Sequence, residues 1–232
     1  MARTQSLKVS EIFASIQGEG VTAGEPATFL RLATCNLHCS FCDTKYTWDF
    51  NNHRYEDEVK VLEVSEVSRT IADHAPRRLV ITGGEPMLQQ PGVTRVLELL
   101  GPDFVVEVET NGTLEPSPEL AARVAQWNVS PKLANSGNRE GLRLRPQVLA
   151  RYLATGRAFL KLVVRDASDT EEAAALVTRL GWPTERVLFM PEARTPEELT
   201  KRHDFVRAES LARGFGVSPR LHVERFGGRR GT

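Results

Sequence analysis

Short apolar runs alternate with amphipathic stretches along the chain. Runs rich in β-branched residues predict strands, and apolar residues that recur three and four positions apart predict helices between them. The predicted strands are 28–33, 79–82, 104–109, 127–130, 159–164 and 186–190. The predicted helices are 63–74, 90–100, 117–126, 145–154, 169–180 and 196–212. This alternation is typical of an α/β fold with a parallel sheet, and six strands predict a partial barrel.

Two segments fall outside the alternation. Residues 44–62 form a polar insertion that contains aromatic residues, and 132–144 form a loop rich in Gly, Asn and Arg. The chain has 232 residues, which is enough for one compact domain with a substantial core. We therefore expect a single domain over 1–232.

Charge and hydropathy exclude several classes of protein. Lys plus Arg and Asp plus Glu number 30 each, so the chain lacks the basic excess of proteins that bind nucleic acid or membrane surfaces. The first twenty residues hold no apolar core of signal-peptide length, and no run approaches the roughly 18 apolar residues of a membrane span. We expect a cytoplasmic protein whose partner is a small molecule, with no nucleic acid and no membrane.

The cysteines of the chain are Cys35, Cys39 and Cys42, which lie close together. A disulfide between two of them would close a very small loop and leave the third unpaired, so metal ligation is the stronger hypothesis. Three thiolates from one loop suit an iron–sulfur cluster with one iron left open. A zinc site completed by His38 or a distant histidine, or three unligated thiols, are the alternatives.

The unusual residues follow the predicted strands. Cys35 comes after the first strand, Gly83-Gly84-Glu85-Pro86 after the second, Thr110-Asn111-Gly112 after the third, Ser130-Pro131-Lys132 after the fourth and Pro191-Glu192 after the sixth. Parallel β/α folds bind ligands at the C-terminal ends of their strands, where the loops converge. The sequence therefore predicts one site at that end of the sheet.

The cysteine spacing, with Phe41 before the last cysteine, resembles the hallmark of the radical S-adenosylmethionine (SAM) superfamily. The segment Gly83-Gly84-Glu85-Pro86 resembles the glycine-rich loop with which that family contacts SAM. The resemblance implies the partial (β/α)6-type barrel of the radical SAM core. It also implies a [4Fe-4S] cluster whose open iron chelates SAM and whose electron cleaves it to a 5′-deoxyadenosyl radical.

Within that superfamily the chain looks most like the 7-carboxy-7-deazaguanine synthases. The shared segments are 16–20 (IQGEG), Arg31, 43–44, 82–86, 109–112 and 130–132. The resemblance implies a lyase that converts 6-carboxy-5,6,7,8-tetrahydropterin to 7-carboxy-7-deazaguanine with loss of ammonia, in queuosine-type 7-deazapurine biosynthesis. SAM would be reused and Mg²⁺ would assist. A homodimer and an external one-electron donor of the flavodoxin or ferredoxin type are further expectations.

The resemblance assigns binding roles but no residue that makes or breaks bonds. Metal ligands are expected at Cys35, Cys39 and Cys42 for the cluster and at Thr44 for Mg²⁺. The residues expected to bind SAM are Gly84, Glu85, Glu109, Ser130, Pro131 and Lys132. The residues expected to bind the pterin are Ile16, Gln17, Gly18, Glu19, Arg31, Thr82 and His222.

Several charged residues have two readings. Arg31 lies in an apolar strand, where its partner is either a substrate carboxylate or an internal glutamate. Glu107 and Glu109 share one face of a strand, and Glu109 lies nearer the site. Lys161 either reaches the barrel mouth or snorkels to the surface, and His222 either approaches the substrate or is structural.

Two other functions compete with this interpretation. A glycyl-radical activase would share the cysteines and the glycine-rich loop but act on a protein. A non-catalytic iron–sulfur or zinc protein would need no open coordination position. The chain also departs from the family at Met190-Pro191-Glu192, where relatives often carry a Gln-Pro pair, so the adenine contacts of SAM are not assigned to residues here.

Overall fold

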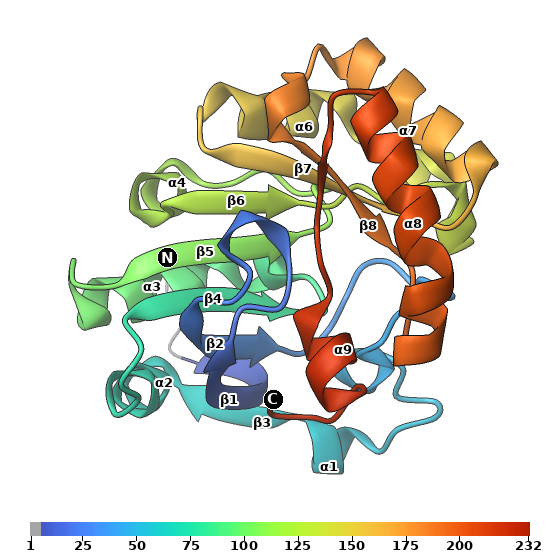
Figure 1. Ribbon diagram of the computed structural model, residues 1–232. Coiled ribbons are helices and arrows are strands. Elements are labelled where there is room, and N and C mark those ends of the chain that lie inside the picture. Colours follow the sequence, from blue (N-terminus) through green and yellow to red (C-terminus); the bar gives the residue numbers. More distant parts are fainter. Residues whose placement is uncertain (1–5) are drawn as a thin grey trace.

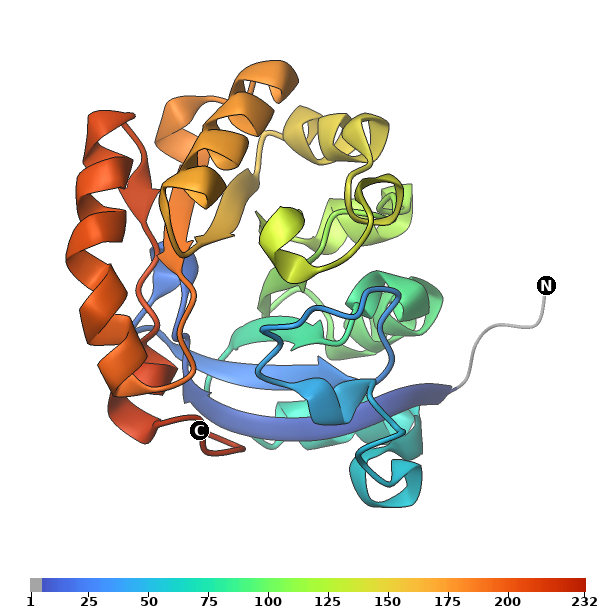
Figure 2. The same cartoon turned by 90° about the vertical axis from the view of Figure 1, so that its right-hand side faces the viewer.

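The computed structural model describes residues 6–232, and one curved sheet forms its centre. In chain order the strands are β1 (Ser6–Ile16), β2 (Pro26–Leu32), β3 (Lys60–Glu63), β4 (Arg78–Gly83), β5 (Val105–Thr110), β6 (Gln126–Val129), β7 (Ala158–Val164), β8 (Val187–Pro191) and β9 (Gly216–Val217). In space their order is β3-β1-β2-β4-β5-β6-β7-β8-β9. The sheet stays open between β3 and β9, and helices cover its outer face (Figures 1 and 2).

The six predicted strands are confirmed as β2, β4, β5, β6, β7 and β8, with ends shifted by one or two residues. Each pairs in parallel with the next, which confirms the partial barrel. The hydrophobic pattern missed β1, which runs antiparallel to both β2 and β3. The register shifts between Val9 and Glu11, and this bulge interrupts the alternation by which a strand is recognised.

The predicted helices are also confirmed. They are α2 (Val64–Ala72), α3 (Gln90–Leu100), α4 (Pro118–Arg123), α6 (Pro146–Ala154), α7 (Ala167–Leu180) and α8 (Pro196–Ala212). Short helices not predicted are α1 (Tyr55–Glu58), α5 (Glu140–Arg143) and α9 (Leu221–Phe226). Single 3₁₀ turns occur at Gly20–Thr22, Lys45–Thr47, Pro86–Gln89, Ala134–Ser136 and Thr184–Arg186.

The two faces of the sheet differ in character. On the outer face, strand residues such as Leu79 and Ile81 belong to the main core together with Val67 and Ile71 of α2. Val80, between them in sequence, faces the other way and packs with Phe29 and Ala27 in a small separate cluster. Because side chains alternate along a strand, the inner face is free to hold the polar groups of a site.

Within residues 6–232, no helix is both long enough and apolar enough to cross a membrane.

Candidate active site

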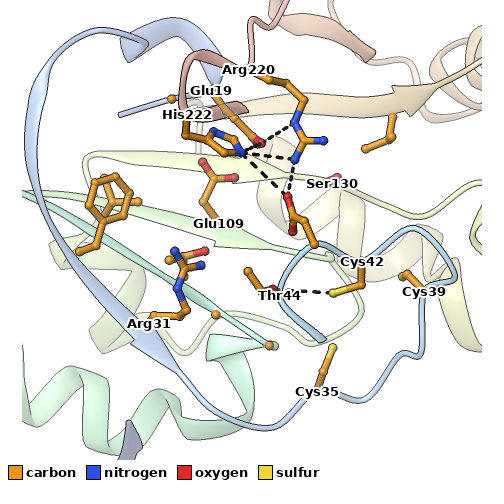
Figure 3. Close-up of a pocket in the computed structure, with 18 of the residues that line it drawn as sticks. Glu19, Arg31, Cys35, Cys39, Cys42, Thr44, Glu109, Ser130, Arg220 and His222 are labelled. Atoms are coloured by element: carbon orange, nitrogen blue, oxygen red, sulfur yellow. Dashed lines mark hydrogen bonds and ion pairs between the residues drawn. The ribbon is translucent and has the colours of Figure 1, made fainter. Parts of the chain in front are cut away.

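A cavity of about 270 Å³ lies at the C-terminal ends of the parallel strands (Figure 3). The predicted site residues that line it are Ile16, Gln17, Gly18, Glu19, Arg31, Cys35, Cys39, Cys42, Thr44, Thr82, Gly84, Glu109, Ser130, Lys132 and His222. Glu85 and Pro131 are predicted site residues that do not line it. Sequence segments far apart in the chain are thus brought to one place.

The three cysteines lie on the loop after β2, residues 33–44, which we call the cysteine loop. All three are free thiols. Burial raises the pKa of Cys35 to about 12, although the Leu37 N–H opposes this effect, and burial likewise raises the pKa of Cys39. Such thiols stay protonated at neutral pH unless a cation binds them, so they suit metal ligation better than nucleophilic chemistry.

Glycines hold the next loop against the cysteine loop. A Cβ on Gly83 would lie 2.0 Å from the Leu32 carbonyl oxygen, and one on Gly84 would lie 1.9 Å from that of Thr34. The Gly84 N–H also donates to the Leu32 carbonyl oxygen, and the Glu85 N–H donates to the Thr34 carbonyl oxygen. The close approach that requires glycine here is therefore made to Leu32 at the end of β2 and to Thr34 of the cysteine loop.

Glu85 is fully buried, and its carboxylate is occupied by its own chain. One oxygen accepts the Met87 N–H at 3.1 Å and the Thr110 hydroxyl at 2.7 Å, and the other accepts the Asn111 N–H at 2.7 Å. Burial raises its pKa against the opposing effect of these donors. This side chain joins the loop after β4 to Thr110 and Asn111 at the end of β5, so its oxygens already have partners within the chain. Pro131 is buried as well.

Lys161 occupies the centre of a charged network on the inner face. Its ammonium lies 2.5 Å from Glu19 Oε2 and 2.7 Å from Glu109 Oε2. Burial opposes the charge of Lys161, but the two carboxylates outweigh it and raise its pKa. Lys161 is 3% exposed, so it points into the barrel and does not snorkel to the surface.

The two carboxylates share this one ammonium unequally. Burial opposes ionisation of Glu19, but Lys161, Arg220 and His222 together lower its pKa to about 2. Burial raises the pKa of Glu109 despite Lys161. Glu109 also accepts hydrogen bonds from Asn128, at 2.9 Å, and from Gln17, at 3.5 Å.

Arg220 links segments that are distant in sequence. Its guanidinium donates to Asp43 of the cysteine loop, to Glu19 at 3.2 Å and to the Ala193 carbonyl after β8. His222 Nε2 lies 3.7 Å from Glu19 Oε1 and 3.9 Å from Asp43 Oδ2 (Figure 3). The pKa of Asp43 is held well below its usual range because Arg220 and His222 outweigh its burial.

His222 reaches this position through the glycine-rich segment after β1. The Leu221 N–H donates to the Gly18 carbonyl at 2.9 Å, and a Cβ on Gly18 would lie 2.4 Å from His222 Nδ1. Gly20 N–H donates to the Ser218 hydroxyl at 2.8 Å. At Gly18 the missing side chain makes room for the C-terminal segment, residues 216–226.

Arg31 has the internal partner that was one of its two readings. Its Nε donates to Glu11 Oε2 at 2.6 Å, and the Tyr46 hydroxyl donates to the same oxygen at 2.8 Å. The guanidinium lies 5.5 Å from the Phe13 ring centroid. Arg31 nevertheless lines the cavity, and no partner within residues 6–232 contacts its terminal nitrogens. It can therefore serve an internal carboxylate and a bound anion together.

Sequence reasoning gave no role to Arg220 or Asp43, although both line the cavity. Their positions in the sequence gave a signal for both: Asp43 directly follows the last cysteine, and Arg220 stands two residues before His222. Arg229, Arg230 and Thr232 line the cavity as well. Ser130 and Lys132 come together as expected, with the ammonium donating to the hydroxyl at 2.9 Å.

The residues present fit the cofactors that the cysteine pattern implies. Three thiols line one cavity, and each accepts an N–H hydrogen bond, as thiolate ligands of clusters do. The same cavity continues to the polar groups of Ser130, Lys132 and Glu109, which could hold the charged and hydroxyl groups of SAM. Within residues 6–232 no histidine joins the cysteines in a ligand group, and His38 is exposed and stacks on Trp48, which disfavours a closed tetrahedral zinc site.

Comparison with known proteins agrees with this geometry. The model of the radical SAM superfamily matches residues 31–206. The 7-carboxy-7-deazaguanine synthase of Pyrobaculum aerophilum is 40% identical over 232 residues, 100% of both chains. That of Halobacterium salinarum is 32% identical and covers 94% of this chain and 90% of its own. The crystal structure of QueE from Escherichia coli has a TM-score of 0.68 at 26% identity, over 92% of this chain and 93% of that one.

The family model spans most of the chain, and a relative at 40% identity matches it over its full length. The chain therefore belongs to the radical SAM superfamily and, within it, to the 7-carboxy-7-deazaguanine synthases.

Proposed function

We propose that this chain converts 6-carboxy-5,6,7,8-tetrahydropterin to 7-carboxy-7-deazaguanine and ammonia. The observation that supports it best is the cavity itself, which is lined both by the three cysteines and by the ion pairs of Lys161 with Glu19 and Glu109. These charged side chains, together with Arg31, offer hydrogen-bond donors and acceptors to a small, anionic ring system. The reaction would belong to queuosine-type 7-deazapurine biosynthesis.

The cysteine loop would hold a [4Fe-4S] cluster through Cys35, Cys39 and Cys42, leaving one iron for SAM. Ser130, Lys132, Glu109 and the backbone at Gly84 would hold SAM. When bound and reduced, the cluster would supply the electron for SAM cleavage, and the chain would position the pterin beside SAM and exclude water.

The pterin would lie between charged and aromatic groups. Arg31 would bind its carboxylate through the terminal nitrogens that Glu11 does not contact. Gln17, Glu19 and His222 supply donors and acceptors for the ring edge. Phe13 and Phe29, stacked with ring centroids 5.0 Å apart, give an apolar wall that a planar ring can contact.

Mg²⁺ would bind at Thr44 together with substrate oxygens and water. Glu19, Asp43 and His222 offer ligand atoms within 4.8 Å of one another, which is a second candidate set. Arg220 already contacts both carboxylates and supplies the positive charge that they need. We therefore propose Thr44 for the metal and not this trio.

A glycyl-radical activase would act on a protein partner. Residues of the C-terminal segment line the cavity here, including Arg220 and His222, and they leave a space of about 270 Å³. That size favours a small substrate. The homodimer, the cytoplasmic location and a donor of the flavodoxin or ferredoxin type remain part of the proposal, on the strength of the family resemblance.

The test is anaerobic incubation of reconstituted protein with SAM, a reductant, 6-carboxytetrahydropterin and Mg²⁺, followed by mass spectrometry. We expect 7-carboxy-7-deazaguanine from the native chain and none from Cys42→Ala. Thr44→Ala should retain the cluster but respond less to Mg²⁺. SAM cleavage without any pterin product would point to a different radical SAM reaction, and bound zinc without iron would contradict the proposal entirely.

A further inference from the structure

Each sulfur of the cysteine loop accepts one N–H hydrogen bond, and the donors come from three places in the chain. The pairs are Leu37 N to Cys35 Sγ at 3.5 Å, Asn138 Nδ2 to Cys39 Sγ at 3.4 Å and Trp48 Nε1 to Cys42 Sγ at 3.3 Å. Two of the three donors are side chains, and both lie outside the regular βα units. We propose that Trp48 and Asn138 are positioning residues that raise the reduction potential of the cluster held by this loop.

The two side chains are fixed in place through His38. The His38 ring stacks on the Trp48 indole with centroids 4.7 Å apart and planes 4° from parallel. The His38 backbone N–H donates to Asn138 Oδ1 at 3.0 Å. The Asn138 amide oxygen thus accepts from the cysteine loop, and its amide nitrogen donates both to Cys39 Sγ and to Ser136 Oγ, the latter at 3.2 Å. Stacking on His38 sets the direction of the Trp48 indole N–H.

Trp48 differs from the other tryptophans of the chain. The indole nitrogens of Trp127 and Trp182 are buried and have no hydrogen-bond partner within residues 6–232. Those two side chains lie in the main core, whereas Trp48 lines the cavity and directs its nitrogen at a sulfur. An indole in this position adds little to the core, so its N–H is the feature that needs an explanation.

The physical effect has a definite sign. A reduced cluster carries one more negative charge than the oxidised form, and its sulfurs become better hydrogen-bond acceptors. Donors aimed at those sulfurs therefore stabilise the reduced form and make the cluster easier for an external donor to reduce. The inference rests on the proposed function, because it requires that the loop hold an iron–sulfur cluster.

The test compares variants of the full-length, anaerobically reconstituted chain. Trp48→Phe keeps a ring to stack on His38 but removes the N–H, and Asn138→Ala removes the second donor. Trp182→Phe is the matched control, since it removes an indole N–H that has no hydrogen-bond partner within residues 6–232. Iron and sulfide are measured first, and the reduction potential then comes from a redox titration followed by electron paramagnetic resonance.

We expect Trp48→Phe to bind a full cluster and to need a lower potential for half-reduction. About tenfold less reduced cluster at a fixed potential corresponds to about 59 mV for one electron. Asn138→Ala should shift in the same direction and Trp182→Phe should not shift. If Trp48→Phe fails to bind a full cluster, the reduction potential of Asn138→Ala tests the inference instead: a lower potential supports it and an unchanged potential overturns it.

Unchanged potentials in fully loaded variants would overturn this inference and leave the proposed function standing. A native chain that takes up no iron would overturn both.

Discussion

Arg31 pairs with an internal carboxylate and leaves the rest of its guanidinium facing the cavity. Its Nε is committed to Glu11 at 2.6 Å, and the side chain also lines the cavity. A planar fork can serve two carboxylates in different directions, whereas a lysine ammonium is a point charge that cannot do so equally well. If Arg31 binds the substrate carboxylate as proposed, the planar shape of the guanidinium matters as well as its charge.

Arg31→Lys should therefore weaken pterin binding by about 1.5–3 kcal/mol, the range for hydrogen bonds to charged groups, because a point charge cannot reproduce two parallel hydrogen bonds to a carboxylate. SAM affinity should hardly change, because the cysteines and Ser130 are untouched. Both affinities can be measured by anaerobic titration calorimetry on reconstituted protein. A loss of SAM affinity with normal pterin binding would show that Arg31 belongs to the SAM side of the cavity.

The ionisation of Glu19 makes the free energy of unfolding depend on pH. Its pKa is about 2 in the folded chain, below the ordinary value of 4.5. A lowered pKa means that ionised Glu19 stabilises the fold above about pH 4.5, and that this contribution disappears as the pH falls toward 2. The contribution is about 3 kcal/mol at most, from the size of the shift.

Glu19→Gln should accordingly lower the free energy of unfolding at pH 7, and its deficit relative to the native chain should shrink below pH 4.5. Denaturant unfolding at a series of pH values measures this deficit. A deficit of the same size at pH 3 and pH 7 would mean that the ion pairs of Glu19 contribute nothing.

The roles of individual residues were only partly predictable. Lys161 had two possible directions because an apolar strand with one lysine is compatible with either, and only the carboxylates across the barrel decide between them. The prediction that Glu85 binds SAM rests on the glycine-rich motif, which does not reveal the internal hydrogen bonds of its carboxylate. Its donors come from Met87, Thr110 and Asn111, and the latter two lie at the end of β5 and just after it, whose approach no local pattern reveals.

At the scale of elements, the loop after β4 packs against the cysteine loop so closely that only glycine fits at position 84. Gly84→Ala would put a methyl group 1.9 Å from the Thr34 carbonyl oxygen, which is backbone and cannot move aside. We expect a lower melting temperature and weaker iron retention, since the cysteine loop must shift. Iron content and thermal unfolding measure both effects.

Gly141→Ala is the control for that substitution. Its Cβ would meet nothing within 4 Å, and the residue lies in the short helix α5. Alanine should be neutral there, or stabilising by about 0.5–1 kcal/mol. Equal losses of iron in the two variants would show that the tight contact at Gly84 has no special importance.

The parallel strands and their helices were predictable because both repeat a clear hydrophobic period. The position of the site followed, since strand ends converge in any such sheet. β1 and α9 were not predictable: β1 is bulged and only partly buried, and α9 spans six residues, too few for a periodic pattern. Both depend on tertiary contacts: β1 pairs with β2 and β3, and α9 is held by the hydrogen bond from the Leu221 N–H to the Gly18 carbonyl.

At the scale of the whole molecule, Arg220 ties together three segments that lie far apart in sequence. Arg220→Ala would leave Asp43 without its closest cation and free the C-terminal segment from Glu19 and Ala193. We expect faster proteolysis within residues 216–226 while the three cysteines still bind iron. Limited digestion followed by mass spectrometry measures the rate.

Arg225→Ala is the matched control because Arg225 is exposed and lies on α9, the helix that Arg220 directly precedes. It should digest at the rate of the native chain. Proteolysis that is no faster in Arg220→Ala than in this control would mean that other contacts, such as that of Ser218 with Gly20, anchor the segment alone.

The anchoring of the C-terminal segment on Gly18 also has a consequence for synthesis on the ribosome. The cysteine loop leaves the exit tunnel early, but His222 and Arg220 are made about 180 residues later. At roughly 5–20 residues per second, that interval is on the order of ten seconds or more. During it the nascent chain presents three thiols that nothing from its own C-terminal segment yet covers. A scaffold that delivers iron and sulfide would meet an accessible loop in this interval, before the last residues enclose the site.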